Sequence, residues 1–535
     1  MRRVLLKLAS GYWIRRPSPD KVVFLSPGRA VVFRGNLTKL LADSLLPLLD
    51  GRRTATEIQD CLTTVSPGII TGLLSQLRQK GLIEAAEYAI EVSNSTFSPA
   101  AAARIDLHPG NIAQLPDPVA ERLQALCDSR TGILQKLEAV RHESSEPMIV
   151  QYRAVGYTNL QSRPSRFVAS GKDLDVLPAL EAVLGESVER YSAGVYQEKS
   201  LVRATFRELG SSAMDPRSLV AFSPEQYRAK GFSLLPFSDA REYSWVNVHC
   251  LTGGDDTFVP AQFVYTPFGV SGSEPILWRS NTNGVAAALD KETSLSNALL
   301  EVVERDALML AWYSRIGVSR IEIPSDTDSH ILDLRERILS CELRVDCFRL
   351  PNEFGIPVSL AVIGSSRPDY PMVCVGCAAS LSWGHAVYKS LLECLQVRAS
   401  LRYRKTLRRT IGSPSGVRSI SDHASYYSAQ PDRLQAFDFL FDSRTVRLEE
   451  VAGAIHTFDK DRRLQECLNR VRGGGHEVYA INLAPPEIQS LGYQVFRVIV
   501  PGLIPIHFGH HRIPLGMQRL VGQPSLVLEW PHPMS

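Results

Sequence analysis

The chain has 535 residues, with 59 basic and 56 acidic side chains and a formal net charge of +3. Hydrophobic residues make up 44% of the chain and charged residues 21%, which is typical of a globular protein and excludes a disordered or fibrous one. The small net charge disfavours nucleic-acid binding, because nucleic-acid-binding proteins usually carry a strong positive field.

The N-terminal apolar run at residues 4–6 is broken by Lys7 and is too short for a signal peptide or a membrane-spanning helix. The nine cysteines are an odd number scattered along the chain, unlike the disulfide framework of a secreted domain. We therefore expect a cytoplasmic protein with reduced thiols and no contact with a membrane.

The first ninety residues predict a domain of their own. Two β-rich runs flank a Ser-Pro-Gly-Arg turn, which predicts a β-hairpin, and three helical patterns follow it. The hairpin strands are at residues 22–25 and 30–33, and the helices are at residues 37–49, 54–62 and 67–80. This order is typical of a winged-helix domain, which we assign to residues 1–90.

Winged-helix domains read DNA or bind peptides, and the third helix distinguishes the two uses. A recognition helix needs polar side chains that reach the bases, whereas residues 68–80 are basic only at their end. Residues 48–58 and 74–83 resemble the PqqD-like leader-recognition domains of peptide-modifying systems. The resemblance implies that a leader peptide adds as a strand to the hairpin edge and packs on the third helix. The alternatives are a winged helix that only docks on the rest of the chain and a DNA regulator.

Residues 91–117 are rich in Ser, Ala, Pro and Asn, which predicts a linker. The remaining residues, 118–535, mix β-rich runs with helical patterns and predict a large α/β domain. Clear examples are the β-rich runs at 245–249 and 495–500 and the helix at 298–313. The expected fold class is therefore α/β, with a winged-helix (α+β) domain in front of it.

The strongest chemical signal is a near-duplication of Glu-x-x-Glu-Arg, at residues 186–190 and 301–305. Both copies have a helical pattern, and residues three apart share a helix face, so each copy presents two carboxylates to one point. Two such pairs repel each other unless cations neutralise them, and oxygen ligands of this kind suit Mg²⁺. We therefore expect a magnesium site that bridges a nucleotide triphosphate. Its ligands would be Glu186, Glu189, Glu301 and Glu304, with Arg190 and Arg305 at the phosphates.

A solvated helix face with ordinary ion pairs is the alternative, and it would explain a single copy. Each copy, however, is embedded in an apolar helix, which places its carboxylates near buried surface. Each also follows a glycine-bearing turn, at residues 169–173 and 280–284, where backbone N–H groups or a Lys could meet an anion. Duplication and context together favour the nucleotide site.

A series of blocks, taken in order along the chain, resembles the signature blocks of the YcaO family. The blocks are residues 129–133, 171–172, 185–192, 283–287, 299–307, 386–398 and 497–502. The resemblance covers about residues 119–535, and the ordered set is far more specific than any one block. It implies a YcaO-type domain that binds ATP and Mg²⁺.

Carried over residue by residue, the resemblance implies the same four glutamates as magnesium ligands. It adds further nucleotide-site residues, which are Lys172, Asn297, Glu393, Gln396, Arg398 and Arg497. Among these, Lys172 and Arg497 join Arg190 and Arg305 as phosphate contacts. Thr293 stands where the family often has Glu, and Glu292 is one residue out of register, so this position departs from the family pattern.

The C-terminal segment, residues 529–535, resembles the proline-rich terminus of azoline-forming YcaO enzymes, although the usual final Pro is absent. In those relatives the terminus enters the active site and helps proton transfer. The resemblance thus implies His532 or the carboxylate of Ser535 as the base. The alternative is a frayed chain end.

The function implied by the resemblance is ATP-dependent cyclodehydration of a ribosomally made precursor peptide. Its Cys, Ser or Thr residues would become thiazoline or oxazoline after phosphorylation of the backbone amide oxygen. Two alternatives are a thioamide-forming enzyme and a non-catalytic leader-binding scaffold that stimulates a partner. The expected partners are the precursor, with its leader on residues 1–90, a flavin-dependent azoline dehydrogenase and a second copy of the chain.

Two further motifs favour packing over metal binding. Cys374 and Cys377 have no second cysteine pair at zinc-site spacing, so we expect them in the core of a strand. His507, His510 and His511 have no nearby carboxylate or cysteine in the sequence, which favours packing or lining a substrate channel.

Overall fold

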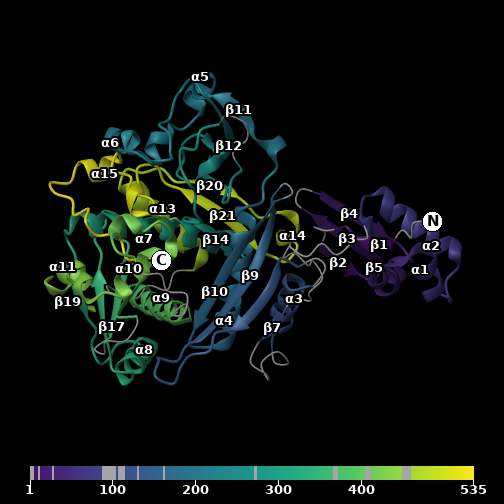
Figure 1. Cartoon of the computed structure of the whole chain (residues 1–535), viewed down its shortest axis with the longest axis horizontal. Helices are drawn as coiled ribbons and strands as arrows, with labels where there is room; N and C mark the ends of the chain where they lie inside the picture. The colour runs from purple at the N-terminus through teal and green to yellow at the C-terminus, as the bar shows by residue number, and fades with distance from the viewer. Residues whose placement is uncertain are drawn as a thin grey trace.

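The computed structural model contains a small N-terminal unit that extends from the side of a larger body (Figure 1). The structure describes residues 5–9, 13–26, 29–86, 104–106, 115–128, 132–160, 163–269, 274–365, 371–403, 411–448 and 459–534. Most of the predicted linker, at residues 91–103 and 107–114, lies outside these ranges, and so do residues 129–131 of the first family-like block. No helix in the described ranges combines the length and the apolar character needed to cross a bilayer.

The N-terminal unit confirms the predicted hairpin and extends it. The hairpin is β3 (Lys21–Ser26) paired with β4 (Arg29–Arg34), and β2 (Trp13–Ser18) adds a third strand on the other side of β3. A second sheet, which the sequence did not predict, has the order β5-β1-β6. Its strands are β1 (Leu5–Leu8), β5 (Asp50–Thr54) and β6 (Ile83–Ala86).

The helices of this unit follow the predicted order with one difference. α1 (Ala55–Cys61) begins at a capping box between Thr54 and Glu57, and α2 (Pro67–Gln79) buries one apolar face. The predicted helix at 37–49 is instead a π-helix, η1 (Leu40–Leu45), followed by a 3₁₀ turn, η2 (Leu46–Leu48). Pro47 lies at the start of that turn and lacks the N–H that a regular helix would use.

Strand β3 joins the N-terminal unit to the larger body. Its side chains alternate, so that Val22 and Phe24 pack in the core of the unit while Val23 and Leu25 pack in the core of the body. The short helix α14 (Pro486–Gln489) contacts β3 from the body's side. The docking expected of a structural winged helix is therefore present, and β4 remains the outer strand of its sheet among the described residues.

The larger body contains three sheets with helices packed between them (Figure 1). The first has the order β10-β9-β8-β7, with β7 (Arg104–Asp106), β8 (Leu134–Ala139), β9 (Val150–Leu160) and β10 (Arg163–Asp173). The second has the order β11-β12-β20-β21-β14, with β13 on β12. Its strands are β11 (Val202–Thr205), β12 (Glu242–Cys250), β13 (Thr257–Pro260), β14 (Val285–Ala288), β20 (Tyr479–Asn482) and β21 (Gln494–Ile499).

The third sheet has the order β18-β17-β16-β15-β19. Its strands are β15 (Ser319–Glu322), β16 (Leu343–Arg349), β17 (Val358–Ser365), β18 (Val373–Ala379) and β19 (Thr445–Arg447). Cys374 and Cys377 lie buried in β18 as unpaired thiols, which confirms the prediction that they are core residues.

Three helices position the site. α4 (Val176–Ala193) packs on β9, β10 and β14; α7 (Lys291–Ser314) packs on β14, β21 and β18; and α9 (Trp383–Tyr403) packs on β17 and β18. Besides α14, the other α-helices that the structure describes in the body are α3 (Asp117–Leu126), α5 (Phe206–Leu209), α6 (Pro224–Arg228), α8 (Ser329–Ser340), α10 (Ile420–Ser428), α11 (Asp438–Phe441), α13 (Lys460–Gly473) and α15 (Gln518–Val521). The observed α/β class matches the expected one.

Gly171 sets the distance between α4 and strand β10. A Cβ at this position would lie 2.1 Å from the carbonyl oxygen of Ala179 and 2.3 Å from the backbone nitrogen of Val183. Because these are backbone atoms of the helix, only a residue without a Cβ allows this approach. The helix that carries the first Glu-x-x-Glu-Arg motif therefore lies directly on the strand.

Candidate functional site

The first Glu-x-x-Glu-Arg motif lies on α4 and faces β10. Glu186 accepts the backbone N–H of Ser170 at 2.9 Å, and its other oxygen lies 2.9 Å from Nη2 of Arg190. We predicted a turn at residues 169–173 with N–H groups free for an anion. This is wrong, because these residues belong to strand β10 and the N–H of Ser170 binds the motif's own glutamate.

The second motif, on α7, repeats this arrangement. Glu301 accepts the backbone N–H of Gly284 at 3.0 Å, and its other oxygen lies 3.5 Å from Nη2 of Arg305. Gly284 has a φ of +75°, and a Cβ there would lie 2.6 Å from the carbonyl oxygen of Val498. In both motifs the first glutamate is thus held by the backbone before the helix and by the Arg four residues later.

The last glutamate of the second motif is anchored differently. Glu304 is 7% exposed and accepts the backbone N–H of Ala379, at the end of β18, at 3.1 Å. Its other oxygen is 2.9 Å from Nη1 of Arg305, but the angle is not that of a hydrogen bond, and both atoms are buried without a hydrogen-bond partner. This oxygen is therefore held by the charge of Arg305 without a hydrogen bond, and a metal ion could bind it beside the guanidinium.

Carboxylates dominate the electrostatics of the site. Burial, followed by the charge of Glu301, raises the pKa of Glu189 well above its ordinary value, and burial also raises the pKa of Glu301. Burial raises the pKa of Glu304 to about 8. The charges of Glu393 and Glu301 raise this pKa further, and the charge of Arg305 opposes them. Crowded carboxylates of this kind are stabilised by a bound cation. This set of oxygen donors fits Mg²⁺, which prefers carboxylates and phosphate oxygens.

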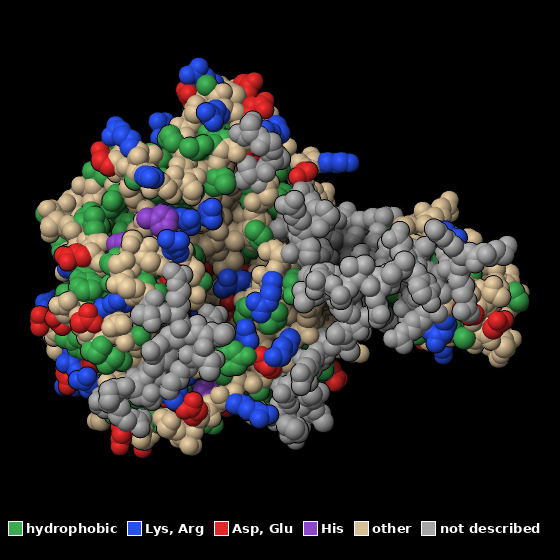
Figure 2. Space-filling view, in the orientation of Figure 1, with side chains coloured by type: hydrophobic (Ala, Val, Ile, Leu, Met, Phe, Trp, Pro, Cys, Tyr) green, Lys and Arg blue, Asp and Glu red, His purple; other side chains and the backbone are tan. Residues whose placement is uncertain are grey.

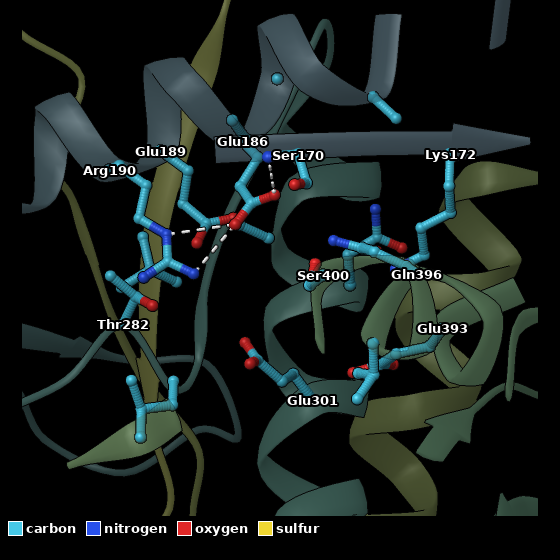
Figure 3. A pocket seen from close by; sticks show the side chains of 18 of the residues that line it. Ser170, Lys172, Glu186, Glu189, Arg190, Thr282, Glu301, Glu393, Gln396 and Ser400 are labelled. Carbon is cyan, nitrogen blue, oxygen red and sulfur yellow. Dashed lines mark hydrogen bonds and ion pairs between the residues drawn. The ribbon is translucent and has the colours of Figure 1, made fainter. Parts of the chain in front are cut away.

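The two motifs face each other across a cavity of about 600 Å³ (Figure 3). Figure 3 shows Glu186, Glu189 and Arg190 on one wall and Glu301 and Glu393 on the other. The predicted site residues that line this cavity are Lys172, Glu186, Glu189, Arg190, Asn297, Glu301, Arg305, Glu393 and Gln396. The structure therefore brings together residues from β10, α4, α7 and α9.

Two smaller cavities adjoin this one. A cavity of about 380 Å³ shares Glu301 and Glu393 with it and contains Glu304. A cavity of about 400 Å³ shares Ser170 and Ser400 with it. Its other walls mix Tyr403 and the aliphatic side chains of Val140 and Val168 with polar ones, which are Glu138, Arg141, Gln151 and Arg153. The charged centre thus has an acidic extension on one side and a mixed extension, with an aromatic ring, on the other.

Some lining residues had not been predicted. Ser170, Thr282 and Ser400 line the main cavity, and Arg463 on α13 donates to the Oδ1 of Asn297 at 2.7 Å. Ser170 could have been found, because it precedes the Gly-Lys pair that had been singled out. Thr282 could have been found in the same way, because it lies in the turn at residues 280–284 that precedes the second motif. Ser400 and Arg463 come from segments that only the fold brings to the cavity.

Two arginines predicted for the nucleotide site, of which Arg497 was expected at the phosphates, do not line the cavity. Arg398 is 1% exposed and forms a bidentate pair with Glu146, with Nη2 to Oε1 at 2.8 Å. Arg497 is 4% exposed, and its guanidinium donates to the carbonyl oxygens of Asn281 and Asn283, both at 2.7 Å. Arg398 therefore anchors α9 to the segment before β9, and Arg497 holds the turn that presents Gly284 to Glu301.

Thr293 has a local role in the first turn of α7. Its backbone N–H and its hydroxyl both donate to the side chain of Asp290, at 2.8 and 3.0 Å, which caps the helix. The departure from the family pattern at this position thus coincides with a helix cap.

The C-terminal segment is buried, so the alternative of a frayed end is wrong. Trp312 donates to the carbonyl oxygen of Trp530 at 3.0 Å, Tyr427 donates to that of Pro531, and His423 donates to that of His532 at 2.7 Å. The chain end lies in the middle of the body, near α7, α9 and α10 (Figure 1). Ser535 lies outside the described residues.

His532 belongs to a buried cluster with His423 and His507. Its Nε2 donates to the carbonyl oxygen of His507 at 2.7 Å, and its Nδ1 is buried without a partner. His423 uses both ring nitrogens, since Nδ1 donates to His532 and Nε2 accepts the N–H of Gly509, while Nε2 of His507 accepts from Tyr313 at 2.9 Å. A metal ion would have to displace these hydrogen bonds. The three histidines therefore form a hydrogen-bonded cluster that holds the C-terminal segment in place, and we call this cluster the seat of the tail. Burial also holds the pKa of His532 well below its ordinary value, which makes it a poor base.

This seat predicts a loss of stability in mild acid. Burial lowers the pKa of His423 to about 4 and also lowers the pKa of His507 well below its ordinary value. An unfolded histidine takes up its proton at about pH 6.5 and the folded ones only far below that, so their stabilising effect is lost as the pH falls. We expect the Tm to fall between pH 7 and pH 5, and to fall less in His423→Gln, whose amide can bond similarly but does not titrate. Equal losses in the wild type and in this variant would contradict the assignment, and His330→Gln, at an exposed position, is the control.

One protein-family model and two proteins of similar sequence match this chain. A family model described as YcaO cyclodehydratase, ATP- and Mg²⁺-binding, matches residues 170–504, well over half of the chain. An uncharacterized protein of Methanothermobacter thermautotrophicus is 27% identical over 344 residues, covering 63% of this chain and 81% of that protein. An uncharacterized protein encoded in the tfuA 3′ region of Rhizobium leguminosarum bv. trifolii is 24% identical over 369 residues, with shares of 66% and 80%.

Solved structures share the fold. A heterocyclase in complex with substrate and cofactor is similar over 98% of both chains, at 16% identity and a TM-score of 0.60. The YcaO protein of Methanopyrus kandleri, bound with AMPPCP and Mg²⁺, is similar over 70% of this chain and 86% of that one, at 24% identity and a TM-score of 0.50. The first of these matches extends over the N-terminal unit as well as the larger body.

Proposed function

The chain belongs to the YcaO family of ATP- and Mg²⁺-binding proteins, and from this premise we propose that it is an ATP-dependent peptide cyclodehydratase. It would convert Cys, Ser or Thr residues of a ribosomally made precursor into thiazoline or oxazoline by phosphorylating the backbone amide oxygen. The observation that carries the proposal is the pair of Glu-x-x-Glu-Arg helices on opposite walls of one cavity.

We assign the phosphates and Mg²⁺ to the carboxylate-lined part of the cavity and the purine ring of ATP to the extension that contains Tyr403. Glu186, Glu189, Glu301 and Glu304 would hold the metal, which would neutralise the phosphates and orient the group to be transferred. The extension near Tyr403 begins at Ser170 and Ser400 and offers aliphatic surface for a purine ring. Lys172, Arg190 and Arg305 line the charged part and would contact phosphate oxygens.

The chemistry requires no nucleophile from the enzyme. When bound, ATP supplies the phosphoryl group that captures the amide oxygen after the substrate side chain has attacked its carbonyl, and phosphate then leaves. The chain's own residues position these partners. The backbone N–H groups of Ser170 and Gly284 hold the two first glutamates in place, and the buried tail brings the chain terminus toward the middle of the body.

Residues 1–90 would bind the leader peptide and residues 118–535 would carry the reaction. β4 is the outer strand of the β2-β3-β4 sheet, and exposed apolar side chains lie on it and on α2, at Val32 (42% exposed) and Ile69 (40%). A peptide that added to β4 could cover both. Tethering the leader there would raise the local concentration of the residues to be modified. A flavin-dependent dehydrogenase partner, a homodimer and a cytoplasmic location stay predictions.

The leader site predicts a binding defect that spares catalysis. In Val32→Glu/Ile69→Glu, charges replace the apolar surface, so we expect the precursor to bind about tenfold more weakly, with an unchanged rate at saturating peptide. Titration of phosphate release against precursor concentration measures both quantities. Leu339→Glu, at an exposed position on α8, is the matched control. A changed maximal rate with unchanged affinity would contradict the assignment.

The function is tested with a precursor peptide, which we would seek as a short open reading frame rich in Cys, Ser or Thr beside the gene. We expect phosphate release that depends on the peptide and a product lighter by about 18 Da, one water, for each modified residue. A gain of about 16 Da, an oxygen exchanged for sulfur, would indicate thioamide formation instead. Absence of peptide-stimulated phosphate release would reject the enzyme in favour of a scaffold.

A further inference from the structure

A second large cavity, of about 710 Å³, lies outside the glutamate site. Its walls come from the segment after α6, the turn before α10 and residues 510–515. The cationic and imidazole side chains that line it are Lys230, Arg418, His510, His511 and Arg512. None of the described residues on its walls is acidic. We refer to it as the basic cavity.

Within the part of the chain that the structure describes, Lys230, Arg418 and Arg512 form no ion pair with a carboxylate. Arg512 has a buried Nε without a partner, and its Nη1 reaches only the carbonyl oxygen of Phe508 at 3.4 Å. Asp422, the carboxylate beside Arg418 in the sequence, accepts the backbone N–H groups of Arg418 and Ser419 at the start of α10.

The histidines of the cavity face the same uncompensated charge. Burial, and then the charges of Arg512, Arg418 and Arg279, hold the pKa of His511 below its ordinary value. Burial and the charge of His511 also lower the pKa of His510, while a hydrogen bond to the backbone of Leu528 raises it. The Nδ1 atom of His510 is buried without a hydrogen-bond partner. Cations that repel one another in this way form a site at which an anion binds favourably.

The basic cavity lies beside the nucleotide cavity along the chain. Arg418 lines the former while Ile420 and Ser421 line the latter, and two residues span at most about 7 Å. Leu528, in the segment that leads to the buried tail, also lines the basic cavity. Figure 2 shows histidine and basic side chains gathered beside the hollow in the middle of this face. A peptide a few residues long could therefore reach from one cavity into the other.

We propose that the basic cavity binds a carboxylate-bearing segment of the peptide substrate while a neighbouring residue of that peptide lies at the nucleotide. The inference rests on the proposed function, because it takes a peptide as the substrate of the adjoining site. Carboxylates pair with arginine through two parallel hydrogen bonds, which suits the guanidinium groups here. A nucleic acid is the less suitable occupant, because the chain as a whole has a net charge of only +3 and the cations are confined to one cavity.

The test uses the full chain without nucleotide and a fluorescein-labelled hexaglutamate peptide, with hexaglutamine as the uncharged control. We expect hexaglutamate to bind, measured by fluorescence anisotropy, with an affinity that falls as salt is raised, and hexaglutamine not to bind. Arg418→Gln and Arg418→Gln/Arg512→Gln should weaken binding progressively, by about tenfold or more in the double variant. Arg335→Gln, at an exposed position on α8, should bind as the wild type does.

The possible results distinguish a failure of the basic cavity from a failure of the proposed function. Equal binding of hexaglutamate by the wild type and by Arg418→Gln would overturn the inference, and Arg418 is exposed enough for that variant to fold if the double variant does not. Tighter binding of a twelve-residue oligothymidylate, lost in the same variants, would also overturn it, in favour of a nucleic acid. Peptide-stimulated phosphate release that persists without hexaglutamate binding would leave the proposed function standing and reject the basic cavity. Hexaglutamate binding without any phosphate release would reject the proposed function and, with it, the peptide substrate as the occupant, and would leave the basic cavity as an anion site only.

Discussion

Replacing Glu301 with glutamine is expected to lower peptide-stimulated phosphate release by about a hundredfold or more. The change removes one negative charge from the wall of the cavity while keeping the size of the side chain. The remaining carbonyl oxygen can still accept the N–H of Gly284, so the turn before α7 should stay in place. The loss would thus fall on the cation and the phosphates rather than on the fold. Steady-state phosphate release with saturating precursor measures it.

The matched control for this variant is Glu336→Gln on α8. Glu336 is exposed, and α8 contributes no residue to the three cavities of the site. We expect the control to keep full activity and both variants to keep the thermal stability of the wild type within about one degree or two, as is usual for surface and isosteric changes. Full activity in Glu301→Gln would contradict the role of the second motif.

Gly171→Ala should damage both stability and nucleotide binding. The new Cβ would meet backbone atoms of α4 at 2.1 and 2.3 Å, so the helix or the strand must move. Overpacking of this kind typically costs about 1–3 kcal/mol. The movement would also separate the N–H of Ser170 from Glu186. One wall of the cavity would then be displaced. Chemical denaturation measures the free energy of unfolding, and calorimetry measures the affinity for an ATP analogue.

Gly364→Ala is the comparison for this prediction. Gly364 also lies in a strand, β17, but a Cβ there would have no atom within 4 Å. We expect this variant to unfold at nearly the same denaturant concentration as the wild type and to bind nucleotide normally. If the two alanine variants were equally stable, the close approach of α4 to β10 would not explain the glycine at position 171.

The candidate site could be predicted from the sequence because its main motif occurs twice along the chain. The two Glu-x-x-Glu-Arg motifs were visible because the spacing of residues on a helix determines which carboxylates share a face. Their cavity also contains Lys172, Asn297, Glu393 and Gln396, as the family resemblance implied. The hairpin and α2 were predictable from turn residues and from helical periodicity, because both signals are local.

Arrangements that depend on tertiary contacts were not predictable in this way. Nothing in the sequence around Arg398 indicates that Glu146 is its partner, since the two are 252 residues apart. The seat of the tail likewise joins His423 to His532 across 109 residues. The segment at 169–173 looked like a turn because of its glycine, whereas that glycine serves the packing of a helix on a strand. Such roles belong to distant backbone atoms, which a local pattern does not contain.

If the two motifs together form one Mg²⁺-dependent nucleotide site, binding of AMPPCP by isothermal titration calorimetry should depend on both motifs and on the metal. We expect one binding site per chain when Mg²⁺ is present, and binding that is strongly weakened when the metal is removed with EDTA. We expect the same weakening in Glu189→Gln and in Glu301→Gln, which change opposite walls of the cavity. Binding that is indifferent to Mg²⁺, or that is lost in only one of the two variants, would contradict a single site formed by both motifs.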